Sequence, residues 1–263
     1  MKPDKALVFF DLDGTLLDKD HHPVASAVRA IRELRANGHL AFINTGRCMA
    51  MINQDILDVG FDGVVAACGT HIVLRDHTIH NLLLPEDLLN QALELMHENQ
   101  VDFWLEGPEN VYLDTQTPDN FHLTFINLFH NWPIRFEDFR VGSLKVNKFS
   151  YEGNSRSNFP PVAEFLRKHF DLIEHRPDHG EALPVGYNKA TGMAVIKDLL
   201  NAHDALTLAF GDSLNDLDML KAADIGIAMG GSRPHLIDHS DHVTDTPDEH
   251  GIENALRHYQ LIG

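Results

Sequence analysis

Short apolar segments that end in a polar residue constrain the fold of this chain more than any other feature of its sequence. The first of them, Ala6–Phe10, consists of five apolar residues and is followed at once by Asp11. A continuously apolar run of this length is typical of a strand that is buried on both faces of a sheet. We expect further strands at His39–Asn44, Gly63–Ala67, Leu206–Phe210 and Ile225–Met229.

Segments with helical periodicity separate these strands. Val24–Asn37 places Val28, Ile31 and Leu34 on one helical face, and Gly38 follows at the position where a helix would end. Further helices are predicted from Thr45 to about Val59, at Lys189–Ala202, at Leu214–Ala223 and from Gly251 onward. The alternation of strands and helices predicts an α/β fold with a parallel sheet and right-handed crossovers.

Residues 81–180 follow a different pattern, in which prolines and glycines fall at element starts and turns. Predicted elements there are helices near Pro85–Asn99, Pro118–Asn131 and Pro160–Phe170, and strands at Val101–Glu106 and Leu144–Tyr151. A chain of 263 residues is long enough for two domains. We therefore expect a core domain formed by residues 1–80 and 181–263, with an α/β cap domain inserted at residues 81–180.

Charge and cysteine content restrict the partners and the compartment. The 21 basic and 39 acidic residues give a formal net charge of −18, and an acidic surface repels nucleic acid and anionic lipid, so neither is expected as a partner. Cys48 and Cys68 lack the CxxC spacing, which fits a reducing compartment. The first apolar run is too short for a signal peptide or a membrane span. We therefore expect a cytoplasmic protein.

Two of the predicted strands end directly in an aspartate, Asp11 and Asp212. Because ligands gather at the carboxyl ends of parallel strands, we expect these carboxylates to face each other. Asn215 and Asp216 share one face of a first helical turn with Asp212. Closely packed carboxylates repel unless a cation lies between them, and oxygen ligands favour a hard ion such as Mg²⁺.

Residues at predicted helix starts are suited to holding a phosphate. Thr45 and Gly46 follow a strand and open a helix, where free N–H groups and the positive end of the helix dipole attract anions. Lys189 also lies at a helix start, which is the electrostatically unfavourable end for a cation. A carboxylate and a bound phosphate are the expected compensation.

Four segments of the chain resemble, in this order, the four motifs of the haloacid dehalogenase (HAD) superfamily: Asp11-Leu12-Asp13-Gly14-Thr15, Thr45-Gly46, Lys189 and Gly211-Asp212…Asn215-Asp216. The long insertion between the second and third motifs is similar to that of Cof-type members with a C2 (C2B) cap. The resemblance implies a Rossmann-like parallel-sheet core with an inserted α/β cap. It also implies a Mg²⁺-dependent phosphatase for small phosphate monoesters, such as sugar phosphates or pyridoxal phosphate.

The resemblance further implies a role for each motif residue. Asp11 attacks phosphorus and forms an aspartyl-phosphate, and Asp13 serves as general acid and then general base. Asp11, the backbone carbonyl of Asp13 and Asp212 hold Mg²⁺, while Asp216 supports Lys189 or metal-bound water. The groups that bind the phosphoryl oxygens are the amides of Leu12 and Gly46 and the side chains of Thr45, Lys189 and Asn215.

Three other functions remain open on the sequence. A phosphomutase of the phosphomannomutase type resembles this core and returns the phosphate to its substrate. Gly211-Asp212-Ser213-Leu214 is similar to the serine motif of GDSL esterases, but no Asp-x-x-His follows to activate Ser213. A binding protein without turnover would retain Mg²⁺. Sugar phosphates, pyridoxal phosphate, flavin precursors and nucleotides all fit this kind of core.

Overall fold

The computed structural model describes residues 5–116, 121–130 and 132–263. The described chain divides into two compact units. The first unit is formed by residues 5–46, 54–79 and 188–263, and the second by residues 47–53 and 80–187. Each unit is built around a sheet and has an apolar core of its own.

An eight-stranded sheet forms the centre of the first unit, counted over the described residues. The strand order is β14 (His242–Val243), β13 (Ile225–Ala228), β12 (Leu206–Gly211), β1 (Ala6–Phe10), β2 (Leu40–Asn44), β3 (Gly63–Ala66), β4 (His71–Leu74), β5 (His77–Asn81). The strands from β14 to β3 pair in parallel, and β4 runs antiparallel to β3. β1 lies between β12 and β2, and all of its residues are buried, as its continuous apolar sequence predicts.

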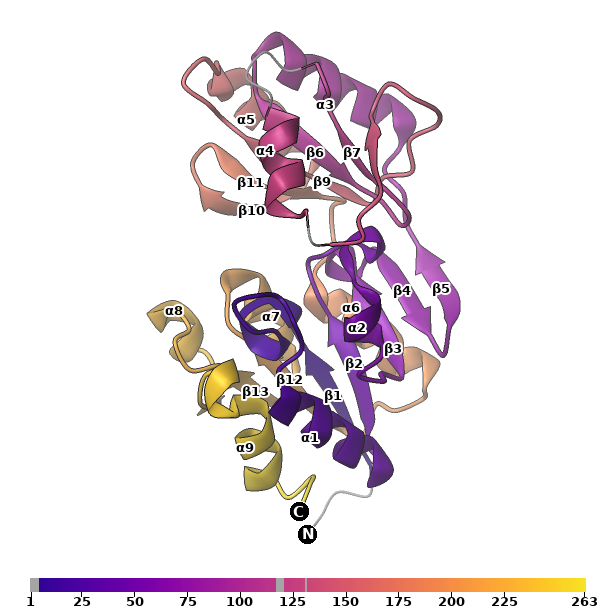
Figure 1. The fold of residues 1–263 in the computed structure, drawn as a ribbon, viewed down its shortest axis with the longest axis vertical. Coiled ribbons are helices and arrows are strands. Elements are labelled where there is room, and N and C mark those ends of the chain that lie inside the picture. Colours follow the sequence, from indigo (N-terminus) through magenta and orange to yellow (C-terminus); the bar gives the residue numbers. More distant parts are fainter. Residues whose placement is uncertain (1–4, 117–120, 131) are drawn as a thin grey trace. The chain divides into compact units, whose positions relative to one another are not determined.

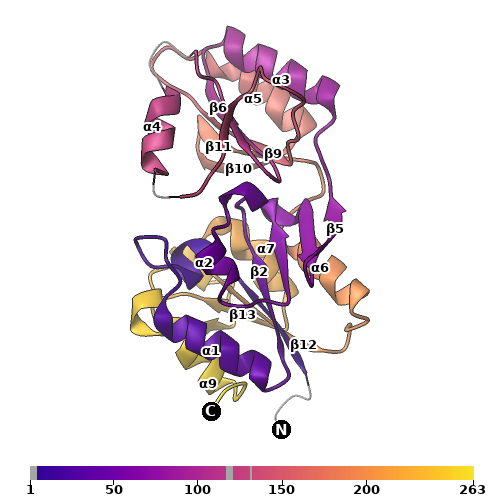
Figure 2. The same ribbon diagram turned by 45° about the vertical axis from the view of Figure 1, so that its right-hand side comes forward.

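Helices cover both faces of this sheet (Figures 1 and 2). They are α1 (Ala25–Ala36), α2 (Gln54–Leu57), α6 (Lys189–Leu199), α7 (Leu217–Ala222), α8 (Pro234–Ile237) and α9 (Gly251–His258), with short helical turns η1 (Leu12–Leu16), η3 (Ala67–Gly69), η4 (Leu214–Asp216) and η5 (Pro247–Glu249). α1 and α9 pack together on one face, and α6 and α7 on the other. Met193 of α6 and Met219 of α7 share an apolar cluster with Phe9 and Phe42 of the sheet. Burial on both faces therefore fixes β1 and β2 beneath the site described below.

The second unit contains a six-stranded sheet within the described residues. Its order is β10 (Asp171–Arg176), β11 (His179–Leu183), β9 (Lys148–Glu152), β6 (Asp102–Glu106), β7 (Val111–Leu113), β8 (Phe136–Asp138), and its helices are α3 (Glu86–Glu98), α4 (Phe121–Leu128) and α5 (Phe159–His169), with the turn η2 (Met49–Met51). α3 and α5 cover one face over a core that includes Phe103 and Phe149 (Figure 2). On the opposite face, Phe121 and Phe125 of α4 lie against Trp104.

The helix predicted from Thr45 to about Val59 is wrong. This stretch contains only the turn η2 and the short helix α2, and residues 47–53 belong to the second unit. The Arg47 guanidinium lies 3.9 Å from the centre of the Trp132 ring and donates a hydrogen bond to the Met51 carbonyl. Packing against a distant part of the chain therefore overrides the local helical pattern.

Other predicted elements differ mainly in their bounds. The strand expected at Leu144–Tyr151 begins at Lys148. The helix expected near Pro118–Asn131 corresponds to α4, and both ends of the expected range lie outside the described residues. The sequence did not predict β4, β5, β7, β8, β10, β11 or β14. Most of these strands are short or half-exposed, so their apolar pattern is weak.

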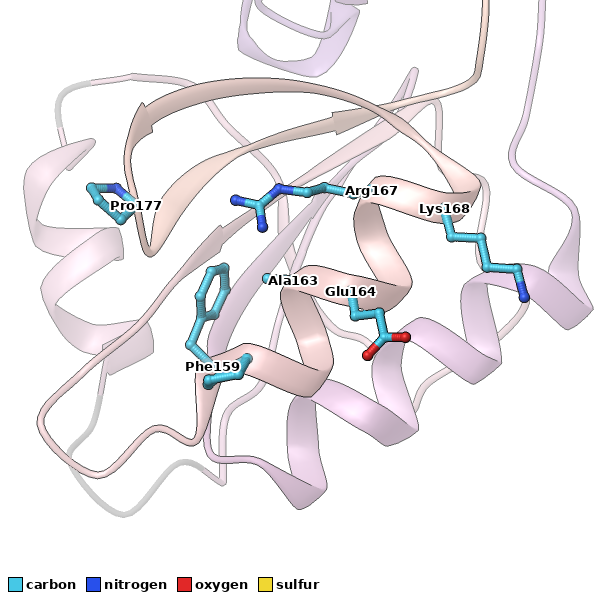
Figure 3. A pocket seen from close by; sticks show the side chains of 7 residues that line it. Phe159, Ala163, Glu164, Arg167, Lys168 and Pro177 are labelled. Atoms are coloured by element: carbon cyan, nitrogen blue, oxygen red, sulfur yellow. The ribbon is translucent and has the colours of Figure 1, made fainter.

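A cavity of about 720 Å³ lies on the second unit beside α5 (Figure 3). Its lining residues are Phe159, Pro160, Ala163, Glu164, Arg167, Lys168 and Pro177, none of them a predicted site residue. The Arg167 guanidinium forms a salt bridge with Glu174 at 2.6 Å.

Among the described residues, no helix combines the length and the apolar character that crossing a membrane requires.

Candidate active site

The carboxyl ends of β1 and β12 lie side by side. Phe10 is opposite Phe210 in the parallel register, and the Asp11 amide donates to the Phe210 carbonyl at 3.0 Å. After β1 the backbone turns at Gly14 with φ of +74°, where a Cβ atom would lie 2.5 Å from Oδ2 of Asp212. The structure therefore brings the segments of Asp11 and Asp212 into close contact, and glycine is required for it.

Lys189 is the cation of this cluster. It is the first residue of α6, whose start is fixed by a reciprocal capping box between Asn188 and Thr191. Its Nζ lies 2.6 Å from Oδ1 of Asp11 and 2.6 Å from Oδ1 of Asp216, and its side chain is fully buried. The unfavourable placement of a cation at a helix N-terminus is thus compensated by two carboxylates.

Asp216 connects the lysine to the β12 strand end. Its Oδ2 accepts hydrogen bonds from the backbone amides of Asp212 and Ser213, each at 3.0 Å. Gly211 permits this approach, because a side chain there would collide with the Asp216 carboxyl group. The Ser213 hydroxyl donates to Oδ1 of Asn215 at 2.7 Å and also contacts Asp216. Its hydrogen bonds therefore stabilise the start of the turn η4.

The crowding of carboxylates shifts their pKa values. Burial, and then the charge of Asp216, raise the pKa of Asp11 well above its ordinary value, although Lys189 opposes the shift. Burial and Asp216 likewise raise the pKa of Asp212 to about 6. Burial alone would lower the pKa of Lys189, but Asp11 and Asp216 raise it above its ordinary value. The site therefore carries more negative charge than Lys189 compensates.

The arrangement of oxygen atoms fits a hard divalent cation. Asp11, Asp212 and Asp216 each offer a carboxylate oxygen, and these atoms lie within 4.8 Å of one another. Both oxygens of Asp216 already accept hydrogen bonds. Oδ1 of Asp212, in contrast, is buried and has no hydrogen-bond partner among the described residues. Asp11 and Asp212 are therefore the carboxylates suited to an ion such as Mg²⁺.

The remaining predicted residues lie on the turns around this cluster. Leu12 and Asp13 follow Asp11 in η1, where Asp13 adopts non-helical dihedral angles and exposes 49% of its side chain. Thr45 is buried directly after β2, and its amide donates to the Val65 carbonyl at 2.9 Å. Gly46 follows in an irregular segment, so the expected helix dipole is not present at Thr45 and Gly46.

Two residues near the site were not predicted from the sequence. Asn44 ends β2, is fully buried, and donates through Nδ2 to the Lys189 carbonyl at 2.9 Å, which ties β2 to the start of α6. A polar residue at the end of a buried strand was the available signal. His21 places Nδ1 3.1 Å from Oδ1 of Asp13, a contact for which the sequence offers no signal.

This combination of a parallel α/β core with strand-end aspartates and a buried lysine defines the class of protein. The chain belongs to the haloacid dehalogenase-like hydrolases, whose family model matches residues 8–256. That range includes every predicted site residue.

The chain is also similar to bacterial phosphatases over nearly its whole length. It is 28% identical to the putative phosphatase YkrA of Bacillus subtilis (strain 168), over 98% of this chain and 99% of the relative. It is 28% identical to the 5-amino-6-(5-phospho-D-ribitylamino)uracil phosphatase YcsE of the same strain, over 98% and 97%. The structure of BT4131, a HAD subclass IIB sugar phosphatase, matches with a TM-score of 0.81 and 25% identity, over 98% of this chain and 100% of that one. The Cof-type resemblance is confirmed, and the protein is a phosphatase of the HAD superfamily.

Proposed function

We propose that this phosphatase hydrolyses small phosphate monoesters with the help of Mg²⁺, through an aspartyl-phosphate on Asp11. The observation that carries the proposal is the buried Asp11 carboxylate, held by Lys189 Nζ at 2.6 Å and lying within the cluster that includes Asp212. A buried carboxylate that a lysine holds in one orientation is suited to nucleophilic attack.

The chain's own residues account for each step of this reaction. Asp11 attacks phosphorus, the bond between phosphorus and the leaving-group oxygen breaks, and an acyl phosphate forms. Lys189 contacts Oδ1 of Asp11 and orients the carboxylate, and its charge favours the transition state. Asp13 protonates the departing alkoxide and then takes a proton from the water that attacks the acyl phosphate. Release of inorganic phosphate regenerates Asp11.

Asp11, Asp212 and the backbone carbonyl of Asp13 are the proposed holders of Mg²⁺. When bound, the ion neutralises charge on the phosphoryl oxygens. Asp216 is proposed to act from outside the ion's ligand set, since its oxygens already hold Lys189 and the backbone of the β12 strand end. The groups proposed to bind the remaining phosphoryl oxygens are Thr45, Asn215 and the amides of Leu12 and Gly46.

The names of the relatives support a small phosphorylated metabolite as substrate. YcsE is named for a phosphoribitylamino-uracil, and BT4131 for sugar phosphates. These names describe hydrolysis, which favours inorganic phosphate as product over the isomeric phosphate that a mutase returns. We further propose that the second unit, residues 47–53 and 80–187, is a cap domain that selects the leaving group. The two buried cysteines, Cys48 and Cys68, lack the CxxC spacing and support a reducing, cytoplasmic location.

The test is phosphate release from a panel of sugar phosphates, pyridoxal phosphate, flavin precursors and nucleotides. We expect turnover with Mg²⁺, none in EDTA, and recovery on adding Mg²⁺. Asp11→Asn should lower kcat by at least about a thousandfold, because removing a covalent nucleophile has effects of that order or larger. Hydroxylamine trapping followed by mass spectrometry should locate the acyl phosphate on Asp11.

A matched control is Asp55→Asn. Asp55 pairs with His22 at 3.0 Å and contributes no oxygen to the cluster of carboxylates. This variant should keep the activity of the unmodified protein. Full turnover by Asp11→Asn would rule out the nucleophile, and activity that persists in EDTA would rule out the ion.

A further inference from the structure

The Asp13 side chain needs an orienting partner to serve as a general acid. Its side chain is 49% exposed, whereas those of Asp11 and Asp216 are buried. Proton transfer to a leaving group requires one orientation of the acid, and a misplaced group transfers its proton poorly. His21 is a candidate for this role, since its Nδ1 lies 3.1 Å from Oδ1 of Asp13.

The turn that carries His21 is held by a set of local hydrogen bonds. The amide of Asp18 donates to the His22 carbonyl at 2.9 Å, and the amide of His21 donates to the Asp18 carbonyl at 3.0 Å. The Asp18 carboxylate accepts from the amides of Asp20 and His22, each at 2.9 Å. The two residues flanking the turn form an antiparallel β-bridge. The turn is therefore a defined structure.

His21 itself adopts a left-handed backbone conformation, with φ of 63°. This conformation is unfavourable for a residue other than glycine. The hydrogen bonds of Asp18 offset that cost, so the turn fixes the backbone from which the imidazole reaches Asp13.

We propose that His21 is a positioning residue for the general acid. Its Nδ1–H donates to Oδ1 of Asp13 and holds the carboxyl group so that Oδ2 carries the transferred proton. In the first step this proton passes from Oδ2 to the leaving-group oxygen. In the second step Oδ2 takes a proton from the attacking water, so His21 neither gains nor loses one. The inference rests on the proposed function, which assigns the acid and base role to Asp13.

The test compares two substrates that differ in their need for an acid. Phenyl phosphate releases a basic phenoxide, whereas 4-nitrophenyl phosphate releases a stable anion that leaves without protonation. An exposed pair such as His21 and Asp13 contributes up to about 1 kcal/mol, or about fivefold in rate. His21→Ala should therefore lower kcat/KM about fivefold for phenyl phosphate and less than about twofold for 4-nitrophenyl phosphate.

A conservative variant distinguishes the hydrogen bond from the rest of the side chain. In His21→Asn, the amide Nδ2 takes the position of the imidazole Nδ1, and asparagine tolerates the left-handed backbone well. This variant should restore kcat/KM for phenyl phosphate to near the original value. If it behaves like His21→Ala, the hydrogen-bond explanation is overturned.

His22→Ala is the matched control, because His22 lies in the same turn and pairs through Nδ1 with Asp55 at 3.0 Å. It should leave kcat/KM unchanged for both substrates. A loss of kcat/KM confined to phenyl phosphate in this variant would show that disruption of the turn causes the effect.

Asp13→Ala tests the proposed function itself. It should lower kcat/KM for phenyl phosphate by about 10² or more relative to 4-nitrophenyl phosphate, and a variant whose loss is larger for phenyl phosphate is called selective. If Asp13→Ala is selective and His21→Ala is not, the inference about His21 fails while the proposed function stands. If neither is selective, the role of Asp13 fails.

Discussion

Lys189 is the residue on which the charge balance of the site depends. It is fully buried between Asp11 and Asp216, whose carboxylates it contacts at 2.6 Å each. A buried cation of this kind costs free energy to desolvate, and that cost is offset only while both partners remain in place. The lysine therefore serves the stability of the first unit and the orientation of Asp11 at the same time.

Lys189→Met is expected to destabilise the protein by about 3 kcal/mol, because it leaves two buried carboxylates without their cation. Activity should fall to background in the same variant. Urea unfolding at pH 7 in EDTA measures the free energy of unfolding without interference from a bound ion.

Lys197→Met is the control on the same helix. Its half-buried Nζ contacts the Thr207 hydroxyl at 3.0 Å and forms no salt bridge with any of the described residues. It should cost no more than about 1 kcal/mol and should leave activity unchanged. Equal losses of stability in the two variants would contradict the special role of the buried lysine.

The turn η1 packs closely against Asp212, beside the paired ends of β1 and β12. Gly14 adopts φ of +74° there, and a Cβ atom would lie 2.5 Å from the Asp212 carboxylate. Gly14→Ala should therefore displace the Asp212 carboxylate. We expect kcat/KM to fall by about tenfold or more, because small displacements of groups in an active site lower the rate strongly. The thermal shift produced by Mg²⁺ should also weaken.

Gly38→Ala separates this contact from backbone strain. Gly38 has φ of +90° with no heavy atom within 4 Å of the added Cβ. Both variants pay about 1 kcal/mol for the left-handed backbone, but only the Gly14 variant meets a neighbouring carboxylate. Equal effects on kcat/KM and on melting temperature would argue against a steric role of Gly14.

A buried ion cluster ties together three strands of the second unit. Lys148 Nζ on β9 lies 2.9 Å from Oε1 of Glu106 on β6 and 2.6 Å from Oε2 of Glu181 on β11. Burial raises the pKa of Glu106, although Lys148 opposes it. Burial also acts to raise the pKa of Glu181, but Lys148 and His175 outweigh it and lower that pKa from 4.5 to about 2.

The lowered pKa of Glu181 predicts acid sensitivity of this unit. A depressed carboxyl pKa stabilises the fold above the ordinary value of 4.5 and loses that contribution as the pH falls toward about 2. Relative to Glu181→Gln, the unmodified protein should lose on the order of 3 kcal/mol across this range. Urea unfolding curves recorded between about pH 2.5 and about pH 7 measure the difference in the free energy of unfolding between the two proteins. Glu174→Gln, an exposed partner of Arg167, should show no such trend.

At the scale of the whole molecule, the net charge of −18 opposes the approach of an anionic substrate. Salt shortens the range of this repulsion, from about 30 Å at 0.01 M to about 8 Å at 0.15 M. KM for a phosphate monoester at saturating Mg²⁺ should therefore fall, by about twofold, as NaCl rises over this range. An increase of KM with salt would show that the local field of the site outweighs the net charge.

The sequence by itself determined the parallel centre of the core sheet, β1, β2, β3, β12 and β13, and most of the residues that gather at the candidate site. Apolar strands buried on both faces are a local signal, and the aspartates at two strand ends follow from it because parallel strands present their carboxyl ends at one edge. Lys189 at the start of α6 was equally readable, since its helical pattern begins with that residue.

Only the tertiary structure decided which atoms of these residues remain available. It shows that both oxygens of Asp216 are already occupied, whereas one oxygen of Asp212 has no partner among the described residues. It also places residues 47–53 in the second unit, so that no helix begins at Thr45. These outcomes depend on contacts between residues far apart in the sequence, such as Arg47 on Trp132. Such contacts are not visible in a local periodicity, and they can override the helical preference that it reports.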